Sequence, residues 1–292
     1  MLMPIPRAQS AMQYLITYGW AILVIVVVFS LLYTLGFFKS GFSVAGTPPG
    51  SCKVFRPNGP KTLQFISLQG TCNSEKPESV GQFSGGNNYV VVNSKFFQGN
   101  SFTILAWVYW PPGTNFAPSD LGYAWSGPGV VDQGFGMFSR SDDWYLNFYA
   151  DDLACSTGPA AGQWYQFGSS WNSATKLQTI WVNGAAACSR TSTGSLVTGM
   201  PLIIGSGSGS WDTPAYMGGS IADVQVYNAS LSANEIQQMY YRGIGGDPIN
   251  IQNLVGWWPL NGDTLDYSGN GNNGVPSGMS FSDTWASSYT PP

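Results

Sequence analysis

The chain has 292 residues, a net charge of −4 and only 9% charged side chains, whereas 15% of its residues are aromatic. The aromatic content excludes a disordered chain, and the lack of a basic cluster excludes a nucleic-acid partner. Histidine is absent and no paired-carboxylate motif of the kind used in glycoside hydrolysis is present, so we expect a protein that is not an enzyme and holds no catalytic cofactor.

The N-terminal part of the chain is a long apolar segment. Residues 14–38 carry no charge and would be roughly 37 Å long as a helix, which exceeds the ~30 Å hydrocarbon core of a bilayer. The central run, residues 21–29, is apolar on every side, so a helix here must be covered by lipid or by other helices. Gly and Pro in residues 40–50 cannot prolong it, and we expect a linker there.

The order of residues before the apolar run resembles an archaeal prepilin signal. A leader, residues 1–8, holds the single charge of Arg7, and a polar stretch then precedes the apolar residues. The resemblance implies that a prepilin peptidase cuts between Ala8 and Gln9. It also implies that residues 9–39 form a helix that lies in the membrane before assembly and then builds a homopolymer. A plain single-pass anchor explains the hydrophobicity equally well, but not the polar stretch.

Beyond the linker, residues 51–292 show short runs with a period of two, broken by Gly, Asn and Pro. This pattern predicts an antiparallel β-sandwich, and the fold class is therefore mainly β behind an N-terminal α-helix. The clearest strands are predicted over three segments: Phe102–Tyr109, Leu177–Val182 and Ile221–Tyr227. Asn183 and Gly184 predict a two-residue hairpin turn, because both residues accept a positive φ.

One helix is predicted after the third of these strands. Ser232 and Glu235 have the spacing of a capping box, and Arg242 and Gly243 are typical of a helix end. The order of strand, Asn-Gly hairpin, strand and capped helix resembles the laminin G-like, concanavalin A-like jelly roll. This resemblance implies a lectin-like head, for which surface glycans are the candidate partners.

The four cysteines fall into two close pairs, and an even number on the exported side suggests two disulfides. Three pairings are formally available, and four buried free thiols are the alternative. We favour Cys52 with Cys72 and Cys155 with Cys188. Cys155 follows a strand-like run, and Cys188 ends a hairpin arm that can lie beside it.

The head contains several candidate binding or modification residues. Four aromatic residues near Gly/Ser/Pro-rich stretches are candidates for stacking on sugars, with core filling as the alternative: Trp125, Trp144, Trp211 and Tyr216.

Asp263 and Asp266 lie in an oxygen-rich turn, and in relatives a structural calcium would bring such a turn toward Asp223. Backbone hydrogen bonds in tight turns are the alternative for these aspartates. Asn228 begins the only Asn-x-Ser/Thr sequon and is a candidate glycosylation site.

The remaining acidic residues of the loops are expected to be solvated. They are five aspartates of the head: Asp132, Asp142, Asp143, Asp151 and Asp152. We therefore assign them no role in binding.

The C-terminal residues 253–292 resemble the opening strands of a laminin G-like domain, although they follow its closing helix. They are either a truncated second domain or the last part of a circularly permuted jelly roll. Truncation would expose an apolar strand at Trp257 and Trp258, so we favour permutation. In a filament the strand could instead be donated to the next subunit. The short linker, residues 243–250, favours pairing within the chain.

These features predict a structural subunit of an archaeal type IV pilus-like filament on the cell surface. In this prediction a lectin-like outer domain supports adhesion. The alternative is a single-pass, membrane-anchored adhesin that binds glycans and does not polymerise. The two hypotheses differ in what covers the apolar helix. Identical helices cover it in a filament, whereas lipid covers it in a membrane anchor.

Overall fold

The computed structural model describes residues 18–30, 50–57, 63–70, 76–116, 121–127, 130–206 and 216–292. The chain divides into two compact units, Met1–Thr47 and Pro48–Pro292. In the first unit, residues 18–30 form an α-helix with exposed side chains, among them Trp20 at 67% exposure. Within the described ranges, no helix reaches the length and apolarity needed to cross a membrane.

Several predictions for the N-terminal region concern residues that the structure does not describe. The leader and its cut between Ala8 and Gln9 lie outside the described residues, as do both ends of the helix predicted over residues 9–39. The linker predicted over residues 40–50 also lies outside them, apart from Gly50, where the first strand begins. These expectations stay predictions.

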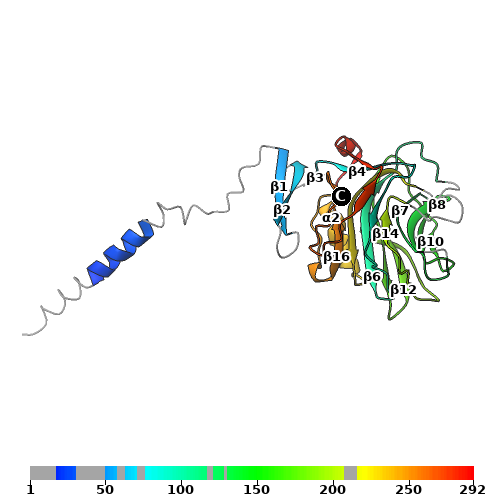
Figure 1. Ribbon diagram of the computed structural model, residues 1–292, viewed down its shortest axis with the longest axis horizontal. Helices are drawn as coiled ribbons and strands as arrows, with labels where there is room; N and C mark the ends of the chain where they lie inside the picture. Colours follow the sequence, from blue (N-terminus) through cyan, green and yellow to red (C-terminus); the bar gives the residue numbers. More distant parts are fainter. Residues whose placement is uncertain are drawn as a thin grey trace, which may run out of the picture. The chain divides into compact units, whose positions relative to one another are not determined.

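The described strands of the second unit form three antiparallel sheets. The small sheet has the order β1 (Gly50–Pro57), β2 (Leu63–Gly70) and β3 (Lys76–Pro77). The seven-stranded sheet has the order β10 (Leu153–Cys155), β9 (Asp143–Asn147), β8 (Phe135–Arg140), β7 (Leu121–Ser126), β14 (Leu202–Ile204), β5 (Tyr89–Val92) and β17 (Val275–Ser277). The eight-stranded sheet has the order β13 (Ala185–Thr191), β12 (Leu177–Val182), β11 (Trp164–Asn172), β6 (Phe102–Tyr109), β15 (Gly218–Tyr227), β4 (Val80–Ser84) and β18 (Ser280–Ser282), with β16 (Leu254–Trp258) paired to β15. The two larger sheets form the layers of an antiparallel β-sandwich (Figure 1).

The strands and the hairpin predicted from the period of two are confirmed. Two strands have the predicted bounds, Phe102–Tyr109 and Leu177–Val182, and the third, Ile221–Tyr227, is the larger part of β15. The turn between β12 and β13 holds Asn183 at φ 51° and Gly184 at φ 76°. Local alternation and turn chemistry were therefore sufficient to place these elements.

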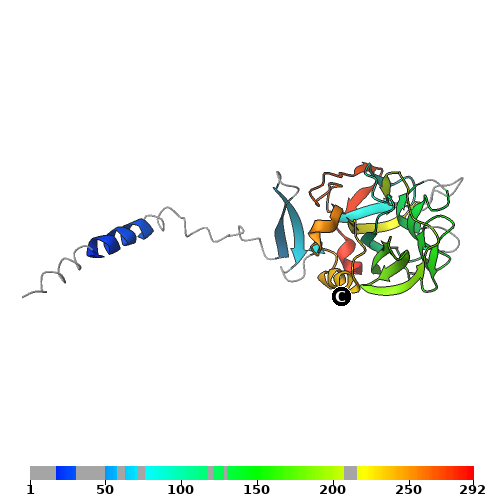
Figure 2. The same ribbon diagram turned by 90° about the horizontal axis from the view of Figure 1, so that it is seen from below.

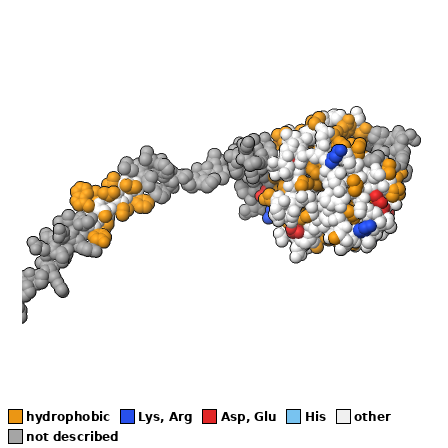
Figure 3. Space-filling view, turned by 60° about the horizontal axis from the view of Figure 1, so that its bottom comes forward, with side chains coloured by type: hydrophobic (Ala, Val, Ile, Leu, Met, Phe, Trp, Pro, Cys, Tyr) orange, Lys and Arg blue, Asp and Glu red, His pale blue; other side chains and the backbone are white. Residues whose placement is uncertain are grey.

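The alternation of side chains along β6 builds two separate apolar layers. Ile104 and Val108 face the other large sheet and join the main core, whereas Leu105 and Trp107 point to the outer side of the eight-stranded sheet. That outer side is covered by the helix α2 (Ala233–Arg242), which lies outside the strands next to the C-terminus in Figure 2. The face of the head that Figure 3 draws is mostly uncharged, with a few scattered Lys, Arg, Asp and Glu side chains.

The helix α2 begins with the predicted capping box. The Ser232 hydroxyl accepts a hydrogen bond from the Glu235 backbone N–H at 3.3 Å, and the Ser232 N–H donates to the Glu235 carboxylate at 2.7 Å. At the other end, Gly243 has φ 75° and its N–H donates to the Tyr240 carbonyl at 2.9 Å. Both ends of the helix are thus defined by local sequence.

The C-terminal strands pair within their own chain. The strand β16 pairs with β15, β17 extends the seven-stranded sheet beside β5, and β18 extends the eight-stranded sheet beside β4. Trp258 in β16 is fully buried in the main core. This is the internal arrangement favoured from the short linker, and the claim that the order is a circular permutation stays a prediction.

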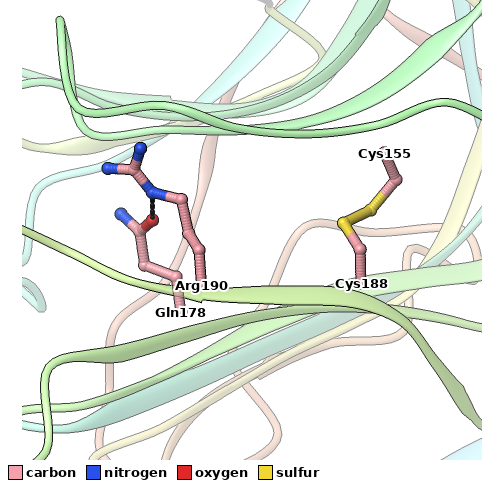
Figure 4. Close-up of a disulfide and its surroundings, with 4 residues drawn as sticks. All are labelled: Cys155, Gln178, Cys188 and Arg190. Atoms are coloured by element: carbon pink, nitrogen blue, oxygen red, sulfur yellow. Dashed lines mark hydrogen bonds between the residues drawn. A yellow bond between two sulfur atoms is a disulfide. The ribbon is translucent and has the colours of Figure 1, made fainter.

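The predicted disulfide between Cys155 and Cys188 is present in the structure. Cys155 belongs to β10 and Cys188 to β13, which are the end strands of the two large sheets. Figure 4 shows the two cysteines meeting between the layers, with the hydrogen-bonded Arg190 and Gln178 at some distance to one side. The disulfide therefore joins the sheets along one edge of the sandwich. Cys72 lies outside the described residues, so the second predicted disulfide stays a prediction.

An ion pair lies on the same edge and corrects one expectation. Asp151, expected to be a solvated loop acid, is only 5% exposed and pairs with Arg190. Its second oxygen accepts hydrogen bonds from Ser192 and from the backbone N–H groups of Thr193 and Gly194. A buried carboxylate needs such partners, and Arg190 lies too far along the chain for a local pattern to reveal the pair.

Candidate functional site

A pocket of about 550 Å³ lies between the end of α2 and the C-terminal segment. Its walls come from the last turn of α2, from residues 247–250, from the short 3-10 helix η1 (Ile251–Asn253), and from the first part of β16. Tyr267 and Ser268, in the turn after β16, complete the lining. The pocket therefore exists only because β16 pairs with β15 and brings the C-terminal segment against the helix.

The buried part of the pocket wall is apolar. Leu254, Trp257 and Tyr267 are each less than a tenth exposed, and the Trp257 and Tyr267 rings meet edge to face with centroids 6.0 Å apart. The Trp257 indole N–H donates to Asp223 at 2.6 Å, and the Tyr267 hydroxyl donates to Asp263 at 2.9 Å. Because these polar groups are bonded within the protein, the two buried rings back the pocket without leaving an unpaired indole N–H or hydroxyl in its wall.

Asp266 fixes the turn that carries Tyr267 and Ser268. Its side chain is fully buried, and its oxygens accept backbone N–H groups of Trp257 at 2.9 Å, Ser268 at 2.9 Å and Asn272 at 2.8 Å. One carboxylate thus ties β16 to both halves of the following turn. The apolar wall of the pocket is rigidly supported as a result.

Polar groups surround the pocket nearer the surface. The Arg242 guanidinium donates to the Asp247 carbonyl at 2.9 Å, which holds the segment after the helix in place. Asn250 has a left-handed backbone and donates through its side chain to Glu235 at 2.7 Å. Gln252 is exposed, and Ile251 is 69% exposed.

Two ionisable groups near the pocket have displaced pKa values. Hydrogen bonds from the Ser232 hydroxyl and backbone N–H lower the pKa of the Glu235 carboxyl, with a further contribution from Asn250. Burial, together with the hydrogen bond to Asp263, raises the pKa of the Tyr267 hydroxyl. Glu235 is therefore held as an anion and Tyr267 as a neutral donor, which keeps the pocket wall in one charge state around neutral pH.

The three aspartates predicted as calcium ligands have hydrogen-bonding roles. Asp223 and Asp266 both bind Trp257, through its indole and its backbone N–H respectively, so the structure does bring these two residues toward one strand. Asp263 accepts the Leu265 N–H at 3.1 Å as well as the Tyr267 hydroxyl. In the described parts of the chain, no group of three acidic, cysteine or histidine residues could hold a metal ion. These oxygens fit the alternative of turn hydrogen bonds, and calcium stays a prediction.

The aromatic residues predicted to stack on sugars are mostly not at the surface. Trp144 is 2% exposed in the main core and Trp125 is 8% exposed, so neither offers a ring face and that expectation is corrected for both. Trp211 lies outside the described residues. Tyr216 is half-buried, stacks on Tyr89 with centroids 6.2 Å apart, and remains a candidate. The pattern failed because Gly-rich neighbours indicate turns without showing which side of a strand faces the core.

Sequence reasoning placed the elements around the pocket without identifying the pocket. Arg242 was assigned to a helix end, Trp257 to a displaced strand, and Tyr267 to a turn. The signal that could have joined them was the apolar strand that follows the closing helix, because a strand in that position must pack against its own helix. Only the pairing of β16 with β15 shows which side chains meet there.

Comparison with known proteins adds a family and a fold. A family model described as the concanavalin A-like lectin/glucanases superfamily matches residues 84–237. All the residues that line the pocket come after this match. A proposed carbohydrate-binding protein from Bacteroides ovatus is 15% identical, with 81% of this chain and 70% of that chain covered and a TM-score of 0.56. A heptameric SAP-like pentraxin from Limulus polyphemus is 14% identical, with 70% of this chain and 94% of that chain covered and a TM-score of 0.50. Likeness at these identities concerns the fold alone, and no curated protein sequence matches the chain.

Proposed function

The chain belongs to the concanavalin A-like lectin/glucanases superfamily, and from this premise we propose that it is a surface-exposed carbohydrate-binding protein. The observation that carries the proposal is the pocket of about 550 Å³, with a rigid apolar wall and a polar rim. The Bacteroides ovatus protein of similar fold is itself described as carbohydrate-binding, which adds support at the level of the fold.

The pocket has the two surfaces that a sugar ring needs. A pyranose has an apolar face of C–H groups and a periphery of hydroxyls, so it prefers an apolar wall beside hydrogen-bonding side chains. Ile251, which is 69% exposed, supplies accessible apolar surface in front of the buried Trp257 and Tyr267 rings. Gln252 and Arg242 supply donors at the rim. A volume of about 550 Å³ is within the range of small-ligand pockets and is large enough for a short oligosaccharide.

We propose binding without catalysis. Glycoside hydrolysis needs two carboxyl groups on opposite sides of the scissile bond, one of them able to give a proton. Near this pocket, Asp223, Asp263 and Asp266 all accept hydrogen bonds that hold the wall, and Glu235 is held as an anion by Ser232. These carboxylates support the shape of the pocket.

Binding is tested with the full chain in detergent on an array of neutral and acidic glycans. Gln252→Ala should weaken binding of the best ligand about fivefold to tenfold, because one hydrogen bond contributes about 1 kcal/mol. Met200→Ala, an exposed residue outside the pocket lining, should leave the affinity unchanged and is the matched control. Absence of glycan binding, or equal affinities for the two variants, would contradict the proposed site.

A second proposal concerns how the head is displayed, namely on a type IV pilus-like filament. The support is the order of leader, polar stretch and apolar run, together with the exposed apolar side chains of residues 18–30, which need a covering partner. Identical helices supply that cover in a filament, and lipid supplies it in the alternative of a single-pass anchored adhesin.

The first residue of the mature protein separates prepilin-type processing from a plain anchor. Cleavage after Ala8 predicts an intact mass that corresponds to a chain beginning at Gln9. A mature protein that begins at Met1, or that lacks the whole apolar segment, would contradict the filament proposal. The glycan-binding proposal would be unaffected by either outcome.

A further inference from the structure

Asn228 stands at the surface with an unused side chain. The residue is exposed directly after β15, and its backbone N–H donates to the Asn253 carbonyl at 2.9 Å. No hydrogen bond joins its side-chain amide to any residue that the structure describes. The backbone is therefore held while the amide projects freely.

Most asparagines of the head differ from Asn228 in this respect. Their side chains bond to backbone groups and shape turns and strand ends, as six of them illustrate: Asn88, Asn147, Asn172, Asn183, Asn261 and Asn272. An asparagine of that kind cannot accept a bulky substituent without losing a structural hydrogen bond. Asn228 can be modified without such a loss.

The rest of the sequon is presented on a fixed loop. The Thr103 hydroxyl donates to the Ala229 carbonyl at 2.8 Å and accepts the Leu231 N–H at 2.9 Å. These two bonds anchor the backbone on both sides of Ser230, whose hydroxyl completes the Asn-x-Ser pattern. The loop thus offers the acceptor asparagine outward from the end of a core strand.

We propose that Asn228 carries an N-linked glycan. In the transfer, the Asn228 amide nitrogen bonds to the anomeric carbon of a polyprenyl-phosphate-linked oligosaccharide. The bond from that carbon to the phosphate oxygen breaks, the lipid phosphate leaves with the electron pair, and the amide loses one proton. The Cys155–Cys188 disulfide is typical of exported proteins, which meet such donors outside the cytoplasm.

The proposed glycan stands beside the pocket. Asn228 is joined by its N–H to Asn253, and the residues on either side of Asn253, Gln252 and Leu254, line the pocket. The attached sugar therefore covers part of the protein surface next to the rim. Measurements of ligand binding should accordingly be made with protein from the natural source.

The test is peptide mapping of the full chain purified from its own cells. Trypsin releases one peptide, residues 191–242, that contains Asn228. We expect its mass to exceed the unmodified mass by whole sugar units, with fragment ions that place the sugars on Asn228. Ser230→Ala and Asn228→Gln should abolish the added mass, whereas Ser230→Thr should keep it.

Asn234→Gln is the matched control, because Asn234 is also exposed in the same peptide but begins no sequon. It should keep the glycan. An unmodified peptide in the wild-type protein from its own cells would overturn the proposal. Added mass that persists in both Ser230→Ala and Asn228→Gln would also overturn it, because the sugar would then lie elsewhere.

Discussion

The two edges of the sandwich are closed in different ways. At one edge, the end strands β10 and β13 belong to different sheets and are joined by the Cys155–Cys188 disulfide and the Asp151–Arg190 ion pair. At the other edge, β17 and β18 follow each other in the chain, and each adds a short strand to one sheet. The first edge depends on side-chain chemistry, and the second depends on the continuity of the backbone.

This difference predicts different vulnerabilities. An open sheet edge exposes unpaired backbone groups, and natural proteins protect such edges by short strands, covering segments or covalent links. The disulfide edge should respond to reductants and to loss of charge. The C-terminal edge should respond to truncation and to high pH, because the segment after β18 packs through buried aromatic residues such as Trp285 and Tyr289.

The largest effect is expected from deleting residues 254–292. The deletion removes β16, β17 and β18 together with the fully buried Trp258, so it opens one edge of both sheets and uncovers the main core. We expect a head without a cooperative thermal transition and without near-UV circular dichroism. Deleting only residues 291–292 is the control. A truncated protein that melts like the wild type would show that the C-terminal edge is dispensable.

Loss of the disulfide should have the next largest effect. The double variant Cys155→Ala, Cys188→Ala should lose about 3–4 kcal/mol of unfolding free energy, because the link closes a loop of 33 residues in the unfolded chain. Urea unfolding measures the loss, and added reductant should lower the midpoint of the wild type more than that of the variant, which keeps Cys52 and Cys72. Equal midpoints for wild type and variant without reductant would contradict the edge-closing role.

Removing the ion pair should weaken the same edge by a smaller amount. Arg190→Met keeps most of the side-chain length and leaves the Asp151 carboxylate with only its hydrogen-bond donors. The cost is about 2 kcal/mol, the size of one hydrogen bond to a charged group, because Arg190 is partly exposed. Lys95→Met removes an exposed cation elsewhere and should change stability very little. Chemical unfolding of both variants tests the prediction, which fails if the two free energies agree.

The smallest effect is expected at Tyr289 on the C-terminal segment. Burial raises the pKa of its hydroxyl from 10.0 to about 12, so the folded protein favours the protonated form. The stabilisation from this preference is complete below pH 10 and is lost as the pH rises through 12. The hydroxyl also accepts the Ile244 N–H at 3.0 Å, so Tyr289→Phe should lose about 1 kcal/mol at neutral pH. Thermal melts between pH 9 and 12 should fall less steeply for Tyr289→Phe than for the wild type. Equal slopes for the two proteins would contradict the prediction and assign the loss of stability at high pH to other tyrosines.

The sequence by itself determined the features that depend on neighbours along the chain. Alternation placed β6 and β12, and the Asn183-Gly184 pair placed the hairpin turn between β12 and β13. Ser232 with Glu235 placed the start of α2. The Cys155–Cys188 pairing was also predicted, because one strand and one hairpin arm were already located. For the strands, the hairpin and the start of the helix, the physical cause acts within a few residues, for example a positive φ or a helix N–H that needs a capping side chain.

Only the tertiary structure decided which surfaces are buried and where a ligand can enter. Trp144 is in the core because Cys155 pairs opposite it on the next strand and β11 closes over it, and Asp151 is buried because β13 brings Arg190 to it. The pocket needs Trp257 to meet Asp223, 34 residues earlier in the chain. Such contacts depend on the register between distant strands, and a pattern of period two specifies which residues share a face without specifying what that face will meet.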